Sequence, residues 1–285
     1  MKMDIPCTTC VLNQLIRTLN ILNISKEKKI EIIRFALKTL YEDEWEEPSV
    51  VYFKIYKFLR KTSGVDDPYR DEKIYCDTKL MEYLNFIRKL VDEADDPLYM
   101  ALKLSISGNM IDFGALEEVD VRNAIRDAIS KRLTIDDYQI FKRKLLNASK
   151  MMIILDNSGE SVFDKIFIEE LLGNSNIEKV YVVVRKEPFI NDVTLKDVLR
   201  IKFDEIDRVE FMEMPVDYNE YKDFTRNNVF DKWFKSMDIV ISKGQGNFEI
   251  FEEYRGVFFG LVTKCEVIAK CFGTSIGDLV FIYKD

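Results

Sequence analysis

A chain of 285 residues that is 47% hydrophobic and 32% charged can form one large or two ordinary domains, and its composition excludes a disordered protein. Its formal net charge of −8 argues against a general nucleic-acid-binding protein, because such proteins need a basic face. The chain contains no histidine, which excludes Ser-His-Asp and Cys-His hydrolases and histidine-ligated zinc enzymes.

The first half of the chain has the hydrophobic period of amphipathic helices. From about Cys10 to Lys150, apolar residues recur at spacings of three and four. Examples are Leu12, Leu15, Ile16 and Leu19, then Leu80, Leu84, Ile87 and Val91. Proline, glycine and aspartate interrupt this pattern at 48, 66–68, 95–97 and 108–109. We therefore predict several helices with few or no strands in an amino-terminal helical domain, 1–150.

The second half alternates short apolar runs with helical patterns. The predicted strands are 151–155, 180–184, 208–212, 238–242, 256–261 and 279–283. The predicted helices are 159–172, 194–201, 218–235, 248–254 and 264–272. This alternation predicts βαβ units and an α/β domain, 151–285, with a mostly parallel sheet and helices on both of its faces.

A strand followed at once by polar residues marks the strongest candidate site. The run 151–155 ends at Asp156 and Asn157, and Gly159 precedes the next helix. The carboxyl edge of an open α/β sheet is where ligands bind. Carboxylate and amide oxygens suit Mg²⁺ or Mn²⁺. The same residues could instead cap the helix, with Glu160 completing a capping box, and the two interpretations are compatible.

A second polar segment, 191–194, follows the predicted strand 180–184. Asp192 could cap the helix predicted to begin at Thr194. Because the segment falls on the same sheet edge as Asp156, the functional interpretation makes Asp192 a third metal ligand.

The segment 243–247 follows a third strand and contains a lysine and two glycines. Gly244 and Gly246 allow backbone N–H groups to face an anion, and Lys243 would add a point charge for a phosphate. The glycine spacing fits neither a P-loop nor a dinucleotide-binding fingerprint. An ordinary glycine-rich turn is the alternative.

Two further segments carry polar or reactive side chains. In 108–114, Gly108 favours a helix break, but Asn109 and Asp112 would share a helical face and could reach towards the sheet edge. Cys7 and Cys10 form a CxxC motif, but the chain has no second CxxC and no histidine to complete a zinc site. We expect packing or structure to be the main role of this pair.

In these motifs the chain resembles the damage-control phosphatase family, in its CxxC-containing branch from archaea and bacteria. The motifs follow the family's order: Cys7-x-x-Cys10, Asp67-Pro68-Tyr69, Gly108-Asn109-x-Ile111-Asp112-Phe113-Gly114, Asp156-Asn157-Ser158-Gly159-Glu160, Asn191-Asp192-x-Thr194, Lys243-Gly244-Gln245-Gly246-Asn247-Phe248-Glu249 and Lys264-Cys265. Ser158 replaces a more usual alanine. The loop 214–221 lacks the glycine-containing composition that is typical of that stretch, which bears on substrate choice.

The resemblance implies a helical amino-terminal part packed on a three-layer α/β/α domain, and metal-dependent hydrolysis of phosphomonoesters such as sugar phosphates or damaged phosphometabolites. It implies that the metal ligands are Asp156, Asn157 and Asp192. It also implies that Lys243 binds phosphate and that Asn109, Asp112 and Asn247 surround the substrate. We add Gly244, Gly246 and Glu160 as predicted substrate contacts.

The expected chemistry is hydrolysis at phosphorus with a divalent cation, Mn²⁺, Mg²⁺, Co²⁺ or Ni²⁺, as cofactor. The predicted catalytic residues are Asp156, Asp192, Lys243 and Asp112. Either an aspartate, with Asp112 as one choice, or metal-bound water attacks phosphorus, and the sequence leaves both open. We expect a cytoplasmic enzyme whose partner is a small phosphorylated metabolite, not a nucleic acid or a membrane.

Two other functions remain open from the sequence. An S-adenosylmethionine-dependent methyltransferase uses a similar sheet, but the first turn here has only Gly159, and the second strand ends in Arg185 and Lys186 rather than an acidic residue. A non-catalytic phosphometabolite-binding protein would keep Lys243 and have little use for a metal.

Overall fold

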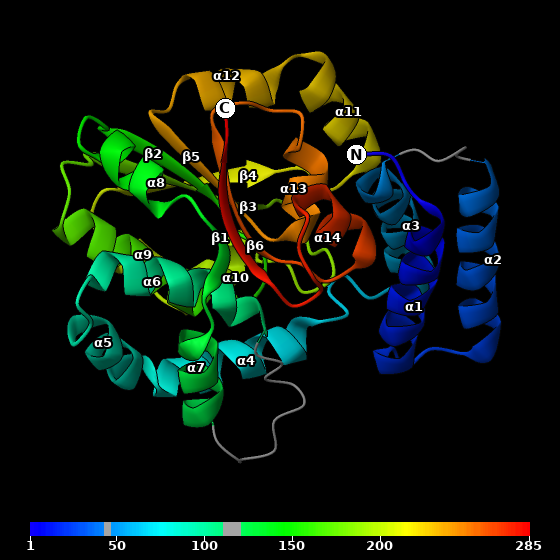
Figure 1. The fold of residues 1–285 in the computed structure, drawn as a ribbon. Helices are drawn as coiled ribbons and strands as arrows, with labels where there is room; N and C mark the ends of the chain where they lie inside the picture. Colours follow the sequence, from blue (N-terminus) through cyan, green and yellow to red (C-terminus); the bar gives the residue numbers. More distant parts are fainter. Residues whose placement is uncertain (43–46, 111–120) are drawn as a thin grey trace.

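A single sheet of seven strands forms the centre of the molecule (Figure 1). The computed structural model describes residues 1–42, 47–110 and 121–285. In spatial order the strands are β1 (Leu133–Asp136), β7 (Leu279–Lys284), β6 (Val257–Val262), β5 (Ile239–Lys243), β2 (Lys150–Ile154), β3 (Lys179–Arg185) and β4 (Val209–Met214). Five adjacent strands, from β6 to β4, are parallel, whereas β7 runs antiparallel to β6 and parallel to β1.

Strand β2 lies at the point where the strand order reverses. The chain moves from β2 to β3 on one side, and β5 pairs with β2 on the other side. The carboxyl ends of these three strands therefore meet at one edge. Such a switch point is the usual ligand-binding position in open α/β sheets.

The central strands β2, β5 and β6 are mostly apolar and buried because both faces of the sheet are covered there. Successive side chains of β2 point to opposite faces, so Met151 and Ile153 pack in one core and Met152 and Ile154 in another. Burial of both sets removes apolar surface from water, which is the main driving force for folding.

Seven helices of the described chain contribute to the core on the first face, from α4 to α10. They are α4 (Arg70–Glu82), α5 (Leu84–Asp92), α6 (Pro97–Ser107), α7 (Val121–Ser130), α8 (Tyr138–Leu145), α9 (Glu160–Gly173) and α10 (Leu195–Arg200). Short 3₁₀ turns, η1 (Gly108–Met110) and η2 (Phe203–Glu205), follow α6 and α10. Helices α6 and α9 pack closely, and a Cβ atom at Gly108 would come within 2.5 Å of the Phe163 ring, so glycine permits this approach.

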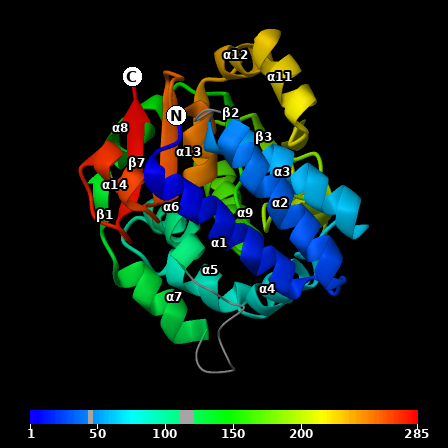
Figure 2. The same cartoon turned by 90° about the vertical axis from the view of Figure 1, so that its right-hand side faces the viewer.

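The second face is covered by α3 (Pro48–Ser63), α11 (Tyr218–Arg226), α12 (Val229–Lys235), α13 (Gln245–Phe251) and α14 (Glu266–Phe272). Helices α1 (Ile5–Ile21) and α2 (Lys26–Glu42) pack beside α3 through a separate small core that includes Val11, Ile32 and Ile55. In Figure 2 the blue helices α1, α2 and α3 form one group at the front of the molecule, and the yellow helices α11 and α12 lie above them. The amino-terminal helices thus reach the carboxyl edge of the sheet.

The fold class predicted from the sequence is confirmed: helices cover both faces of a mostly parallel sheet, with a helical amino-terminal region. The six predicted strands and the short helices that connect them are present, with small shifts at their ends. The predicted helix 218–235 is two helices, because Asn228 between them has a left-handed backbone, with φ of 52°.

In the first half, the described residues before 149 form helices and one short strand, which agrees with the prediction of several helices and few or no strands. Residues Leu133–Asp136 form strand β1, which pairs with β7 from the far end of the chain. A strand of four residues shows too little alternation to be seen in the sequence. Residues before the predicted boundary at Ser149–Lys150 therefore contribute to the sheet. Among the described helices, none combines the length and apolar character needed to cross a membrane.

Candidate active site

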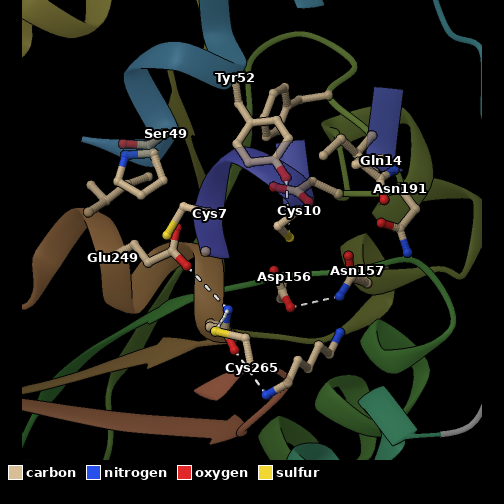
Figure 3. Close-up of a pocket in the computed structure, with 18 of the residues that line it drawn as sticks. Cys7, Cys10, Gln14, Ser49, Tyr52, Asp156, Asn157, Asn191, Glu249 and Cys265 are labelled. Carbon is tan, nitrogen blue, oxygen red and sulfur yellow. Dashed lines mark hydrogen bonds between the residues drawn. The ribbon is translucent and has the colours of Figure 1, made fainter. Parts of the chain in front are cut away.

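Asp156 and Asn157 lie directly beyond β2, at the switch point of the sheet. Both side chains are buried. Asp156 Oδ2 accepts a hydrogen bond of 2.7 Å from Nδ2 of Asn157 (Figure 3). It accepts a second, also of 2.7 Å, from Nδ2 of Asn109. The carboxylate is therefore held by two amides, one from the sheet edge and one from the helical half of the chain.

Asp192 is joined to this pair by backbone hydrogen bonds between two loops. Residues Asn157 and Asp192 form an isolated antiparallel bridge. Val193 donates its backbone N–H to the carbonyl of Asp156 at 2.9 Å, and Ser158 donates to the carbonyl of Asn191 at 3.0 Å. The loops after β2 and β3 thus bring Asp156, Asn157 and Asp192 together, as the sequence predicted.

A buried arginine that sequence reasoning did not assign to the site orients Asp192. Arg185, the last residue of β3, donates from Nε to Asp192 Oδ2 at 2.7 Å and from Nη2 to Asn247 Oδ1 at 2.8 Å. Burial raises the pKa of Asp192 to about 6, with Arg185 opposing the rise and Asp156 adding to it. The signal in the sequence was a basic residue at the end of an apolar strand, where burying a charge without a partner costs free energy.

Asn109 and Lys264 connect the helical half to the sheet edge. Asn109 Oδ1 accepts a hydrogen bond from Nζ of Lys264 at 2.6 Å and another from Nδ2 of Asn157 at 3.2 Å. The prediction that Asn109 reaches towards the sheet is therefore confirmed by its contacts with Asp156 and Asn157. Asp112, predicted to share its face, lies outside the described residues.

The turn after β5 passes very close to Asp156. Gly244 has φ of 81°, and a Cβ atom there would lie 2.1 Å from Cγ of Asp156. Glycine is therefore required for both the backbone conformation and the space. At Gly246 no atom lies within 4 Å of such a Cβ, so its surroundings are open. Asn247 is buried and donates to the carbonyls of Leu155 at 2.9 Å and Lys243 at 2.8 Å.

Lys243 lies in the interior, where three acceptors surround its ammonium group. Nζ donates to Glu160 Oε1 and Asp164 Oδ1, both at 2.6 Å, and to the carbonyl of Ser105 at 2.8 Å. Burial alone would lower the pKa of Lys243, but the Asp164 and Glu160 carboxylates raise it. Burial raises the pKa of Glu160 and Asp164, and Lys243 opposes that rise. In this arrangement, neither Lys243 nor Glu160 lines the cavity at Asp156.

An ionic network centred on Lys73 of α4 supports the loops after β2 and β3. Lys73 lies 2.7 Å from Asp67 Oδ2 and 2.8 Å from Asp197 Oδ2, and Asp197 accepts from the backbone N–H of Thr194 at 2.9 Å. One turn later, Asp77 accepts from the backbone N–H of Gly159 at 2.8 Å. The amino-terminal helices thus fix the positions at which the loops after β2 and β3 leave the sheet.

A cavity of about 240 Å³ opens over these residues and is lined by Asp156, Asn157 and Asp192 together with helices α1 and α3. Figure 3 shows three thiols around it, from Cys7, Cys10 and Cys265. All five cysteines lie in described segments, and none is in a disulfide. Each of the three sulfurs accepts a hydrogen bond, from Asp4, Tyr52 and Gln245 respectively.

The donor set at the sheet edge fits a hard divalent cation. The hydrogen bonds that described side chains donate to these two carboxylates go to Oδ2, from Asn157 and Asn109 to Asp156 and from Arg185 to Asp192. The charged residues that line the cavity are Asp156, Asp192, Glu249, Arg185 and Lys264. Asp156 and Asp192 place two carboxylates beside the proposed ion, and their negative charge favours a cation at this edge of the cavity.

Clusters made only of charged or soft ligands do not provide an alternative metal centre. Within residues 1–42, 47–110 and 121–285, no three histidine, cysteine, aspartate or glutamate side chains are grouped to hold a metal ion. The set Asp156, Asn157 and Asp192 differs from such clusters because its third member is an amide.

Known proteins match this chain over almost its whole length. A damage-control phosphatase of Pyrococcus horikoshii is 30% identical, with 98% of this chain and 97% of that protein aligned. An uncharacterized protein of Methanocaldococcus jannaschii is 28% identical over 99% of this chain and 95% of its own length. The crystal structure of a DUF89 family protein from P. horikoshii superposes with a TM-score of 0.86 at 26% identity and covers 100% of both chains.

A family model provides the assignment. The model described as the damage-control phosphatase ARMT1-like domain matches residues 3–280. This range includes every motif on which the resemblance was based and both the helical and the sheet-containing regions. The chain therefore belongs to the damage-control phosphatase family.

Proposed function

We propose that this protein is a metal-dependent phosphatase that hydrolyses phosphomonoesters of small metabolites, with sugar phosphates or damaged phosphometabolites as its substrate class. The observation that carries the proposal is the bridge between Asn157 and Asp192, which joins two loops so that Asp156, Asn157 and Asp192 line one cavity. The names of the aligned relatives, damage-control phosphatases of P. horikoshii and Archaeoglobus fulgidus, support the reaction type.

In this proposal Asp156, Asn157 and Asp192 hold the cation. A divalent ion bound there would polarise the phosphoryl group and neutralise charge that develops during phosphoryl transfer. Arg185 keeps Asp192 in position, because its Nε donates to the Oδ2 atom and leaves Oδ1 free for the ion. Asn109 does the same for Asp156 through its contact of 2.7 Å with Oδ2.

The phosphate is proposed to lie between this ion and the cavity residues of the β5–α13 turn and of the loop before α14. Lys264 lines the cavity and carries an ammonium that can face a phosphate oxygen. Gly246 has open space above it for an anion to approach its backbone. Asn247 fixes the turn through the carbonyls of Leu155 and Lys243.

The proposal changes the predicted roles of Lys243 and Glu160 and leaves that of Asp112 as predicted. For Lys243, a direct phosphate contact would require the ammonium to leave Glu160, Asp164 and the Ser105 carbonyl, so we propose that it acts by holding these groups beneath the site. Glu160 then acts through Lys243 rather than by touching substrate. For Asp112 the role as nucleophile or base stays a prediction, as does the choice between aspartate and water as nucleophile.

The test is phosphate release from p-nitrophenyl phosphate and from a panel of sugar phosphates, with Mg²⁺, Mn²⁺, Co²⁺ or Ni²⁺ added to chelator-treated protein. We expect turnover only with added metal. Asp156→Asn and Asp192→Asn should lower kcat at least 100-fold and weaken metal binding measured by calorimetry. Asp207→Asn, which changes an exposed aspartate, is the matched control and should behave as wild type.

The proposal fails if the wild-type protein binds these metals and releases no phosphate from any substrate, or if Asp192→Asn retains full turnover with unchanged metal affinity. The second result would remove Asp192 from the ligand set. Calorimetry with S-adenosylmethionine on the same preparation tests the methyltransferase, and binding of that cofactor would favour it over the phosphatase.

A further inference from the structure

Glu249 is an acidic side chain that lines the active-site cavity and has no role in holding the proposed cation. It lies on α13, one turn beyond Gln245, and belongs to the motif that follows Lys243. Figure 3 shows its carboxyl group pointing towards the centre of the cavity, beside Cys7 and on the opposite side of Asp156 from Asn157. It is partly buried, so it faces the cavity rather than bulk water.

One carboxyl oxygen of Glu249 is fixed and the other is available. Gln245 Nε2 donates to Glu249 Oε1 at 3.2 Å. The Gln245 amide is itself oriented, because its Oε1 accepts the backbone N–H of Lys264 at 3.0 Å. Within the described segments, Oε2 of Glu249 receives no hydrogen bond. A carboxyl group held at one oxygen and open at the other is well arranged to donate a proton to a bound molecule.

The surroundings of Glu249 favour its protonated form near neutral pH. Burial raises its pKa to about 7, opposed by the Gln245 amide and the amino terminus and assisted by the carboxylates of Asp156 and Glu252. Cys7 and the Tyr52 hydroxyl also face it, from α1 and α3.

Cys7 and Tyr52, which lie near Glu249, are poorer proton donors. Burial raises the pKa of Cys7 above that of an ordinary thiol and raises the pKa of Tyr52 well above its usual range. Lys264 donates to Asn109 and is proposed to face phosphate. A proton donor works best when its pKa lies near the operating pH, and of Glu249, Cys7 and Tyr52 only Glu249 meets that condition.

We propose that Glu249 is the general acid of the reaction and protonates the oxygen of the leaving alcohol. The proposal rests on the proposed phosphatase function and adds the residue that makes alkyl phosphates, whose alkoxides are poor leaving groups, good substrates. Asp156, Asn157 and Asp192 hold the phosphoryl end, and Glu249 lies across the cavity, where the organic group of the substrate would sit.

The reaction balances with the phosphate ester, water and protonated Glu249 as its reactants. The bond between phosphorus and the ester oxygen breaks, its electron pair stays on that oxygen, and protonated Glu249 supplies the proton that makes the alcohol. A new bond joins phosphorus to an oxygen that comes from water. The products are then the alcohol, dihydrogen phosphate and the Glu249 carboxylate, and transfer of one proton from dihydrogen phosphate back to Glu249 leaves hydrogen phosphate.

The test compares two substrates that differ in their need for a proton donor. p-Nitrophenyl phosphate releases a phenolate that is stable without protonation, whereas glycerol phosphate releases an alkoxide that is not. We expect Glu249→Gln to lower kcat for glycerol phosphate about 10²- to 10⁴-fold, the usual contribution of general acid–base catalysis, and to change kcat for p-nitrophenyl phosphate less than about tenfold. The decline of the glycerol phosphate rate at alkaline pH should also disappear in this variant.

Equal losses with both substrates, or no loss with either, would overturn the assignment. The exposed Glu253→Gln is the matched control and should leave both rates unchanged. Thermal unfolding of Glu249→Gln separates a folding defect from a catalytic one, and Glu249→Asp, which keeps the acid, should recover part of the glycerol phosphate rate. Failure of the phosphatase proposal looks different, because wild-type protein would then hydrolyse neither substrate.

Discussion

Arg185 and Asp192 form a buried ion pair at the base of the cavity, with Nε and Oδ2 2.7 Å apart. The guanidinium is also bonded to Asn247, so one side chain links the loop after β3 to the turn after β5. A buried arginine of this kind fixes geometry through two directed bonds, which a lysine cannot reproduce.

Replacing Arg185 by Met should therefore destabilise the protein and lower its activity. The variant leaves Asp192 buried without its cation, a loss that typically costs about 3–5 kcal/mol. Without Arg185 the pKa of Asp192 should rise above about 6, because the opposing charge is gone. Urea unfolding at pH 7 measures the first effect. Lys186→Met is the control, because its exposed pair with Glu220 should contribute little. Equal unfolding midpoints for the two variants would contradict the assigned role of Arg185.

Gly244→Ala should abolish turnover while the protein still folds. The new Cβ would lie 2.1 Å from the Asp156 carboxyl, in a backbone with φ of 81°, so the carboxylate or the turn must move. We expect kcat to fall at least 100-fold and the affinity for Mn²⁺ to fall with it. Gly173→Ala adds a methyl group where no atom lies within 4 Å, and it serves as the control. Wild-type metal affinity in Gly244→Ala would show that the turn does not constrain Asp156.

Lys73 is expected to stabilise the folded protein beside the site. Lys73 is buried between Asp67, which is partly exposed, and Asp197, which is buried, and Lys73→Ala would remove their shared cation and leave Arg200 alone to pair with Asp197. The expected loss in the free energy of unfolding is about 3–5 kcal/mol. Lys79→Ala, on the same helix but paired with Glu82 on the surface, should have little effect. Chemical unfolding of both variants compares them directly, and a loss of less than about 1 kcal/mol for Lys73→Ala would mean that the network tolerates an unpaired carboxylate.

The buried carboxyl group of Asp77 should make the stability of the folded protein depend on pH. Burial raises its pKa from 3.8 to about 7, with the Gly159 N–H and Arg200 opposing. Because the folded state binds this proton more tightly than the unfolded state, the free energy of unfolding should fall as pH rises from about 4 to about 7 and then level off. The size of this effect is at most roughly 4 kcal/mol.

Asp77→Asn removes that titration and can still accept from Gly159. The difference in unfolding free energy between wild type and Asp77→Asn, measured by urea unfolding at several pH values, should therefore shift in favour of the variant between pH 4 and pH 7. A difference that does not change with pH would show that Asp77 titrates normally in the folded protein.

Because three thiols lie in the cavity, a ligand bound there should protect them from alkylation. Cys7, Cys10 and Cys265 line it, whereas the exposed Cys271 does not. Phosphate together with Mg²⁺ should slow alkylation of the first three by iodoacetamide and leave Cys271 unaffected, as measured by mass spectrometry of peptides. Equal protection at Cys271, or none at Cys10 and Cys265, would place the bound phosphate elsewhere.

The fold class could be predicted from the sequence because it depends on patterns within short segments. Apolar runs such as 151–155 identify strands that are covered on both faces, and their alternation with helical patterns requires parallel connections. Strand β1 escaped this reasoning, since four residues carry too little pattern and its existence depends on pairing with β7. The break at Asn228 escaped for a similar reason, because a single left-handed residue does not change the hydrophobic period.

Sequence alone determined which residues stand at the sheet edge. Asp156, Asn157 and Asp192 follow strand ends, and the carboxyl ends of parallel strands must meet on one side of the sheet. Only the tertiary structure decided which charged groups meet one another. Lys243 turns inward because Glu160, Asp164 and the Ser105 carbonyl, from two helices, converge on its ammonium. Arg185 bonds to Asn247, 62 residues away in the chain, and Glu249 lines a cavity whose other wall comes from α1 and α3. The physical reason is that electrostatic partners are selected by distance in space and by burial, and neither quantity is a local property of the sequence.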